Sequence, residues 1–286
     1  MKAAGTQMPP VAVLMSPGMK NRFAQVMVGL AVWFAGGAYA AAPKVEAEGV
    51  SPVPIREEAL REHTVLLLGD SLIATSFGEH LESRLDSHPL IRCKRRAKTS
   101  SGLARPDFFD WMEEGQREVV RHNPEVVVVI LGGNDGQPLL ERKGRGGVSW
   151  GKPEWEPAYR QRVESFLQVL AAPGRRVLWL ALPPTGLPRF ERKLELIRRI
   201  QREALAGRED TVHFDTSPLF TDAKGKPLRE ARVQGFRKPR ALKMEDGVHF
   251  TLAGGHYFAN KVYPEVLDLL GLGEEPQKGT VATVQD

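Results

Sequence analysis

The 286-residue sequence contains a single cysteine, Cys93, so the chain cannot form an intramolecular disulfide. A protein without disulfides must be held together by its hydrophobic core, and a chain of this length can bury one. Cys93 lies in IRCKRR, a predicted strand with no glycine-rich turn beside it. The sequence therefore favours a structural cysteine over a nucleophilic thiol at this position.

The sequence also lacks a large excess of charge of either sign. Its formal net charge is +5, but residues 1–40 hold three basic residues and no acidic one. The rest of the chain has 37 basic against 35 acidic residues, a net charge of +2. This excess is too small to indicate a nucleic-acid partner, and we expect none.

Residues 1–42 have the features of a secretory signal peptide. A short positive segment, Met19–Arg22, precedes the apolar core FAQVMVGLAVWF, and small residues follow at 38–42. The start of translation is then expected at Met15 or Met19. We expect an exported protein, periplasmic or secreted. The alternative is an uncleaved N-terminal membrane anchor, because the apolar stretch approaches spanning length, and this is the only membrane contact that the sequence suggests.

Short apolar runs alternate with helical patterns in residues 63–272, which we interpret as one domain. Residues 43–62, rich in Pro, Glu and Ala, are predicted to be a linker, and residues 273–286 a disordered tail. Strands are expected at 64–68, 126–131, 176–182 and 211–214, with a weaker candidate near residue 92. Helices are expected at 72–86, 107–121, 155–172, 189–206 and 252–270. No internal repeat occurs.

Near-continuous apolar runs are typical of strands that are buried on both faces of a parallel sheet. The alternation predicts an α/β fold with a single doubly wound sheet. Right-handed crossovers then place every strand's carboxyl end, and the loop after it, on one edge. Two long polar loops, 136–154 and 221–245, interrupt the alternation, and loops of this size are usually functional or disordered.

Reactive or hydrogen-bonding residues follow several of these strands. Ser71 follows the first strand, Gly102 the weaker second candidate, and Asn134 the run VVVVIL. Asp246 and His249 come just before the last helix. These four segments are expected to meet at the carboxyl edge of the sheet.

Each of these residue types has a role in acyl transfer. The Ser71 hydroxyl is a weak nucleophile without a base, and His249 is a base able to take its proton. Asp246 would fix the tautomer of the imidazole and stabilise the imidazolium. The backbone N–H groups of Ser71 and Gly102 and the Asn134 amide would donate to the oxyanion of the tetrahedral intermediate. A glycine at position 102 would let the substrate approach the backbone closely.

These segments resemble the SGNH hydrolase family, also called GDSL esterases. The four blocks of that family read here GDSL (69–72), SSGLARP (100–106), GGND (132–135) and DGVH (246–249), in family order. The resemblance implies a flavodoxin-like three-layer fold with a five-stranded sheet, a Ser-His-Asp triad, and neither metal nor cofactor. The sequence of the second block, SSGLARPDFFDW, is similar to that of an exported bacterial subgroup of the family. Related exported members act on O-acetylated cell-wall or capsular sugars.

Other interpretations of single motifs stay open. Asp70 and Ser71 could simply cap a helix, since both residue types are favoured there. His213 and Asp215 in TVHFDT lie on one face of a strand, but two ligands do not make a metal site. Ile73 stands two residues after Ser71, so the G-x-S-x-G elbow of α/β-hydrolases is absent.

Three residues near the expected edge are candidates for substrate contact. Arg105 either pairs with a nearby aspartate or faces the substrate. Gln137 and Trp150 belong to the long loop after Asn134, where cationic and aromatic side chains suit a sugar chain, although the tryptophan could equally pack onto the domain.

The sequence thus predicts an esterase that cleaves acyl groups, O-acetyl above all, from a small molecule or a polysaccharide. One alternative is an acyltransferase with the same three residues, in which an alcohol replaces water as the acceptor. The other is an exported glycan-binding module without activity. The sequence predicts no oligomeric state.

Overall fold

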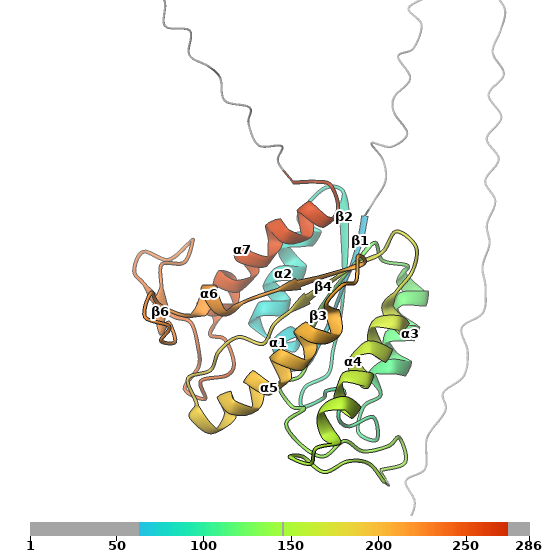
Figure 1. Ribbon diagram of the computed structural model, residues 1–286. Helices are drawn as coiled ribbons and strands as arrows, with labels where there is room; N and C mark the ends of the chain where they lie inside the picture. The colour runs from blue at the N-terminus through green and yellow to red at the C-terminus, as the bar shows by residue number, and fades with distance from the viewer. Residues whose placement is uncertain (1–62, 145, 274–286) are drawn as a thin grey trace, which may run out of the picture. The chain divides into compact units, whose positions relative to one another are not determined.

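Five parallel strands form one central sheet in the computed structural model, which describes residues 63–144 and 146–273 of the chain. The strands are β1 (His63–Gly69), β2 (Ile91–Ala97), β3 (Val126–Ile130), β4 (Arg176–Leu180) and β5 (Thr211–Phe214). Their order is β2-β1-β3-β4-β5, and every neighbouring pair is parallel (Figure 1). All five predicted strands are present, and the flavodoxin-like strand order is confirmed.

The predicted signal peptide, the linker and residues 274–286 of the tail lie outside the described residues. Within the described part of the chain, no helix is both long enough and apolar enough to cross a bilayer.

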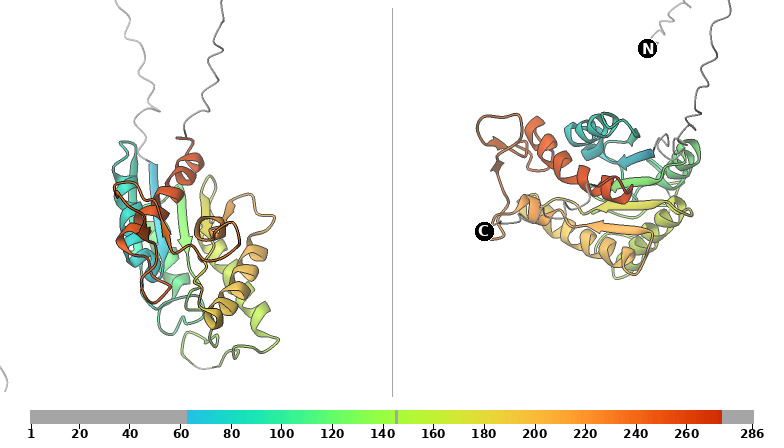
Figure 2. Two further views of the ribbon diagram at one scale, coloured as in Figure 1. Left: turned by 90° about the vertical axis from the view of Figure 1, so that its left-hand side faces the viewer. Right: turned by 90° about the horizontal axis from the view of Figure 1, so that it is seen from above.

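Helices cover both faces of the sheet. They are α1 (Ser71–Ala74), α2 (Ser76–Asp86), α3 (Trp111–His122), α4 (Trp155–Leu170), α5 (Pro188–Leu205), α6 (Ser217–Phe220) and α7 (Leu252–Leu269). α2 and α7 pack together on one face, and α3, α4 and α5 lie on the other (Figures 1 and 2). Because both faces are covered, the apolar residues 65–68 of β1 and 126–130 of β3 are fully buried.

Two of the predicted helices differ from the observed ones by more than two residues. The helix expected at 72–86 is broken at Thr75, whose backbone is extended, so that α1 is only one turn long. Gly78 permits this break, because a Cβ there would lie 2.0 Å from the carbonyl oxygen of Ile73. The helix expected from residue 107 begins at Trp111 instead, since Asp110 caps it by accepting the N–H groups of the second and third helical residues.

The two long loops have little regular structure. The loop 136–154 contains one isolated bridge, between Leu139 and Val148. The loop 221–245 contains the two-residue strands β6 (Glu230–Ala231) and β7 (Arg240–Ala241), which pair antiparallel. Strands this short have no readable hydrophobic periodicity, so the sequence did not predict them.

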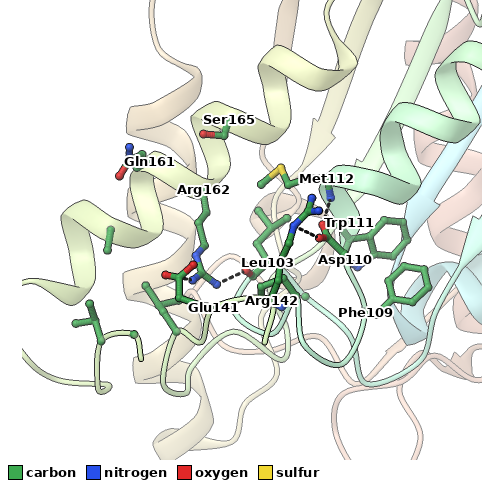
Figure 3. A pocket seen from close by; sticks show the side chains of 16 residues that line it. Leu103, Phe109, Asp110, Trp111, Met112, Glu141, Arg142, Gln161, Arg162 and Ser165 are labelled. Atoms are coloured by element: carbon green, nitrogen blue, oxygen red, sulfur yellow. Dashed lines mark hydrogen bonds and ion pairs between the residues drawn. The ribbon is translucent and has the colours of Figure 1, made fainter. Parts of the chain in front are cut away.

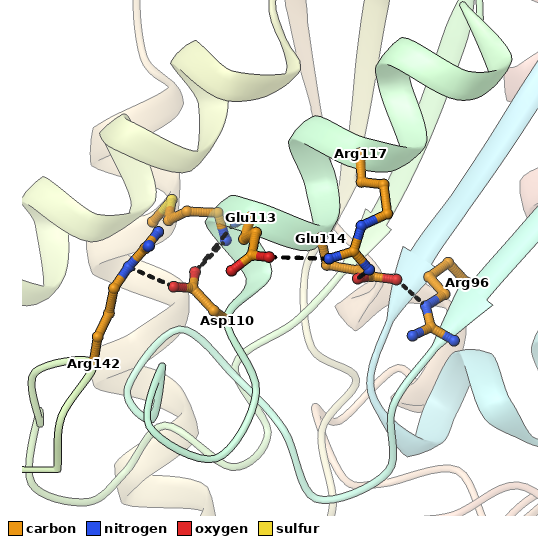
Figure 4. Close-up of polar contacts among 7 residues, drawn as sticks. Arg96, Asp110, Glu113, Glu114, Arg117 and Arg142 are labelled. Atoms are coloured by element: carbon orange, nitrogen blue, oxygen red, sulfur yellow. Dashed lines mark hydrogen bonds and ion pairs between the residues drawn. The ribbon is translucent and has the colours of Figure 1, made fainter.

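Ion pairs hold the segment between β2 and α3 in place (Figure 4). The nearly buried carboxylate of Glu114 on α3 pairs with Arg96 from β2 and with Arg117. Arg142 from the loop after β3 pairs with Asp110 at 2.6 Å. A buried carboxylate needs such partners to offset its desolvation, so these contacts restrain both ends of the segment.

The contact between α2 and α7 is expected to be sensitive to a single added methyl group. A Cβ on Gly255 of α7 would lie 2.6 Å from the carbonyl carbon and the Cβ of Ser76 on α2. Gly255→Ala should therefore lower the free energy of unfolding, measured in urea, by about 1–3 kcal/mol. Lys261→Ala, at an exposed position of α7, should change it by less than about 0.5 kcal/mol. Equal stability of the two variants would contradict this tight contact.

Candidate active site

The carboxyl ends of three neighbouring strands supply three of the predicted segments. Ser71 follows β1 directly, Gly102 follows β2, and Asn134 follows β3. In the sheet β1 lies between β2 and β3, so these segments meet at the same edge, as expected from the parallel order. The fourth segment, with Asp246 and His249, precedes α7.

Asp70 caps the helix at the end of β1, and Ser71 does not. An oxygen of Asp70 accepts the N–H of Leu72 at 3.0 Å, and Ser71 is the first residue of α1. The Ser71 hydroxyl is therefore available for another partner. Its Oγ lies 2.8 Å from Nε2 of His249, a residue 178 positions away in the chain.

His249 is held by Asp246 from the other side of its ring. Nδ1 of His249 lies 2.7 Å from one oxygen of Asp246, and the other oxygen accepts the backbone N–H groups of Val248 and His249 at 2.9 and 3.0 Å. Burial alone would raise the pKa of Asp246. The hydrogen bonds from His249 and the two N–H groups outweigh burial and hold this pKa below its usual range.

The loop that carries Asp246 and His249 is closed by Lys243, which the sequence analysis missed. Lys243 and Phe250 form an isolated antiparallel bridge, and the ammonium of Lys243 donates to the carbonyl of Val248 at 2.7 Å. Its nitrogen lies 3.6 Å from the centre of the Phe250 ring. Burial lowers the pKa of Lys243 to about 7. No motif signals this lysine, because only the folded loop brings it under His249.

Asn134 connects the segments after β2 and β3. Its side-chain amide donates to the carbonyl of Ser101 at 2.9 Å and lies 3.5 Å from an oxygen of Asp70. Ser101 immediately precedes Gly102, whose backbone N–H has no acceptor among the described residues. The structure therefore brings Ser71, Asn134 and the Gly102 segment to one place.

Asp135 is a second residue that the sequence analysis did not assign. Its buried carboxylate accepts the N–H groups of Leu103 and Ala104 at 3.1 and 2.9 Å and the hydroxyl of Tyr159 at 2.8 Å. A Cβ on Gly102 would lie 2.0 Å from this carboxylate. Glycine is thus required here by the packing of Asp135, which differs from the expected reason of close substrate approach. The only feature of the sequence that could have indicated a role for Asp135 was its position next to Asn134.

Asp70 and Asp135 form a pair of neighbouring buried carboxylates beneath the site. Burial raises the pKa of Asp70 to about 7, and the negative charge of Asp135 adds to this effect, while hydrogen bonds from backbone N–H groups oppose it. Burial also raises the pKa of Asp135. Asp70 therefore supports the turn at Ser71, and near neutral pH a large fraction of it carries a proton.

A small pocket opens beside Ser71 and His249. Its volume is about 70 Å³. The apolar part of its wall consists of Leu72, Leu182, Pro183, Phe190 and Leu194. Thr185, Lys243 and Asn134 also line it. The pocket is far smaller than the 300–1,000 Å³ typical of sites for larger ligands.

The three candidates for substrate contact have partners within the protein. Arg105 pairs in a bidentate manner with Asp107, at 2.8 Å for both contacts, and lies 3.4 Å from the side-chain oxygen of Gln137. Gln137 donates to the carbonyl of Asn134 at 2.5 Å. Trp150 packs edge-on against the buried Trp155, with ring centres 4.4 Å apart. All three residues thus support the loop after β3.

A larger cavity, of about 300 Å³, lies on the far side of the segment after β2 (Figure 3). Neither Ser71 nor His249 lines it. Arg162 of α4 lines it and donates to the carbonyls of Leu103, Ala104 and Leu140. The guanidinium thereby holds the segment that contains Gly102 against the loop after β3.

The remaining candidates lie apart from Ser71. Cys93 is buried in β2, and burial raises the pKa of its thiol, which opposes a nucleophilic role. Asp215 accepts the N–H of Ser217 at the start of α6. His213 is half-buried, and burial lowers its pKa. No group of three or more His, Cys, Asp or Glu side chains among the described residues could hold a metal ion.

The family model described as "Protein of unknown function (DUF459)" matches residues 64–265, which include every segment of the site. The chain belongs to this family. No curated protein matches the sequence.

Solved structures with a similar fold include several esterases. A carbohydrate esterase of family 3 from Talaromyces cellulolyticus has 15% identity and a TM-score of 0.50, over 73% of this chain and 98% of that chain. TesA has 24% identity and a TM-score of 0.48, over 72% and 99%. An esterase from Pseudoalteromonas has 14% identity and a TM-score of 0.46, over 73% and 99%. At these identities the likeness shows the fold alone.

The raised pKa of Asp70 predicts a specific effect of pH on stability. Between about pH 4 and pH 7 the native state keeps a proton on Asp70 that the unfolded state has lost, so this residue makes the protein less stable as the pH rises. Asp70→Asn keeps an oxygen to cap α1 but cannot ionise. Relative to wild type, the variant should gain up to about 4 kcal/mol in unfolding free energy between pH 4 and pH 8.

Urea unfolding at a series of pH values would measure this gain. Parallel curves for wild type and variant across the range would mean that Asp70 ionises normally in the folded protein.

Proposed function

We propose that the protein is a serine esterase that removes short acyl groups, O-acetyl above all, through a covalent intermediate on Ser71. The observation that carries this proposal is the continuous contact from Ser71 Oγ to His249 Nε2 and from His249 Nδ1 to Asp246, at 2.8 and 2.7 Å. Serine and histidine at hydrogen-bond distance, with a carboxylate behind the ring, form the arrangement that activates a hydroxyl.

The proposed reaction assigns each proton to a named atom. With Asp246 accepting the Nδ1 proton of His249, Nε2 is the acceptor that takes the hydroxyl proton of Ser71. The Oγ–C bond forms as Ser71 attacks the ester carbonyl. His249 then returns the proton to the alkoxide oxygen as the C–O bond of the ester breaks. Water repeats the sequence in the second half and releases the carboxylic acid.

The oxyanion of each tetrahedral intermediate would be stabilised by backbone and amide donors. The N–H of Gly102, free of any acceptor in the described part of the chain, supports this role. The Asn134 amide lies where the segments after β2 and β3 meet, and its hydrogen bond to the carbonyl of Ser101 orients it. Donors held by the protein need no rearrangement when the charge develops, which is what makes them effective.

The small apolar pocket beside Ser71 supports a short acyl group. A volume of about 70 Å³ suits an acetyl group. Export of the enzyme, which the first 42 residues predict, would give it access to acetylated carbohydrate of the cell envelope.

The proposal predicts that the chain hydrolyses a short-chain aryl acetate and that Ser71→Ala reduces kcat at least a thousandfold, because no nucleophile remains. The reduction should occur without loss of stability, which urea unfolding would check. The control is Ser83→Ala, a serine exposed on α2, which should retain full activity. A Ser71→Ala variant as active as wild type would overturn the proposal.

Asp246→Asn should reduce kcat about a thousand- to ten-thousandfold, because the amide favours the wrong tautomer of His249. The KM for the aryl acetate should change little, since Asp246 contacts His249 and not the acyl pocket. Steady-state kinetics of the variant would measure both values. A variant that changes KM alone would assign Asp246 to substrate binding instead.

A further inference from the structure

The segment 221–245, hereafter the basic segment, carries a concentrated positive charge. It holds eight Lys or Arg residues and three Asp or Glu residues, so its net charge of +5 equals that of the whole chain. The basic residues are Lys224, Lys226, Arg229, Arg232, Arg237, Lys238, Arg240 and Lys243. The remainder of the chain has no net charge, so the positive charge of the protein is concentrated in this segment.

This charge is not neutralised within the protein. None of the eight side chains forms an ion pair with a carboxylate of the described residues. All except Lys243 are exposed. By contrast, arginines elsewhere, such as Arg96, Arg105 and Arg199, pair with carboxylates. A group of exposed cations without partners raises the local concentration of anions.

The basic segment forms one wall of a large cleft. The cleft has a volume of about 880 Å³ and lies between this segment and the loop 184–187 after β4. Lys226 and Arg229 line it together with the exposed Leu187 and Met244. Figures 1 and 2 show the segment around β6 projecting beside α6 and the first turns of α7.

The cleft adjoins the pocket at Ser71. Thr185 and Lys243 line both cavities, and the cleft also contacts Gly247, between Asp246 and His249. A ligand bound along the cleft therefore passes next to the residues that are proposed to cleave the ester.

We propose that the cleft and the basic segment bind the chain of an anionic polysaccharide, so that acyl esters on carboxylate- or phosphate-bearing sugars are the preferred substrates. This inference rests on the proposed esterase function and specifies its substrate. The acyl group would occupy the small pocket, and the charged sugar chain the large cleft. The difference between 70 and 880 Å³ suits a short group carried on a long chain.

A polysaccharide fits these features better than a membrane does. The site is concave, and Met244 is the only large apolar side chain that is exposed on the described basic segment. A membrane-binding surface would instead present several apolar or aromatic side chains for insertion. Asp222, Glu230 and Glu245 also line the cleft, in equal number with Lys226, Arg229 and Lys243, so the net positive charge of the basic segment lies on its residues outside the cleft.

The test compares two polymers with the full-length chain. One is partly O-acetylated polygalacturonate, which is anionic, and the other is neutral dextran with the same acetyl content. The double variant Lys226→Gln/Arg229→Gln removes two cations of the cleft. Its matched control, Arg121→Gln/Lys261→Gln, removes two exposed cations from α3 and α7. For each protein, kcat/KM for the polymer is divided by kcat/KM for an aryl acetate.

We expect wild type to prefer the anionic polymer by tenfold or more at low salt, and this preference should largely disappear at 0.5 M salt, where exposed charges are screened. The cleft variant should lower the normalised value for the anionic polymer roughly tenfold, as expected for two exposed charge contacts, and leave that for dextran unchanged. The control variant should leave both values unchanged. Equal losses in the two double variants, or no preference in wild type, would overturn the inference.

Binding separates this inference from the proposed function. Affinity electrophoresis of the Ser71→Ala variant in gels that contain either polymer measures recognition without turnover. Retardation by the acetylated polygalacturonate alone, with no aryl acetate hydrolysis by wild type, would support the binding site and refute the esterase. Retention on anionic phospholipid vesicles without retardation by the polysaccharide would assign the basic segment to a membrane surface and refute the inference.

Discussion

The buried carboxylate of Asp135 is the interaction on which the arrangement of the site depends. It accepts hydrogen bonds from Leu103 and Ala104 in the segment after β2 and from Tyr159 in α4, which are two separate parts of the chain. Moving any of them away would leave a buried carboxylate without its partners, at a cost of several kcal/mol in folding free energy. The position of Gly102, packed directly against this carboxylate, follows from it. The backbone after β2 is therefore held in place before any substrate binds.

The distance between Ser71 and His249 depends on a different part of the molecule. Ser71 begins α1, which leads directly into α2, and His249 lies just before α7. α2 and α7 pack closely on one face of the sheet. Ser76 donates to the carbonyls of Phe250 and Thr251, which ties the two helix starts together. Packing between helices thus aligns two side chains that come from opposite ends of the domain.

The pocket at Ser71 and the cleft beside it differ in size and in the chemistry of their walls. The pocket next to the hydroxyl is small and largely apolar, whereas the adjoining cleft is large and is lined by both basic and acidic side chains. Apolar walls favour the burial of an alkyl group, and exposed cations attract an anionic chain at longer range. Lys243 borders both cavities and also closes the loop of His249. The walls of both cavities and the positioning of His249 therefore share one residue.

The strand content and the candidate residues were predictable from local patterns. Runs such as VVVVIL are long, apolar and bounded by polar segments, so their strands were found at the correct places, and parallel order put Ser71 and Asn134 at one edge. Helix boundaries were less accurate. The break at Thr75 arises from packing across Gly78, which leaves no periodic signal in the sequence.

The sequence by itself determined which residues stand at the strand ends, because hydrophobic periodicity and strand order are local and topological properties. Only the tertiary structure decided how Asp135, Lys243 and the basic segment contribute. Their effects depend on burial, on hydrogen bonds between distant segments and, for the basic side chains, on having no ion pair with a carboxylate of the described residues. Such properties exist only once distant segments are packed together.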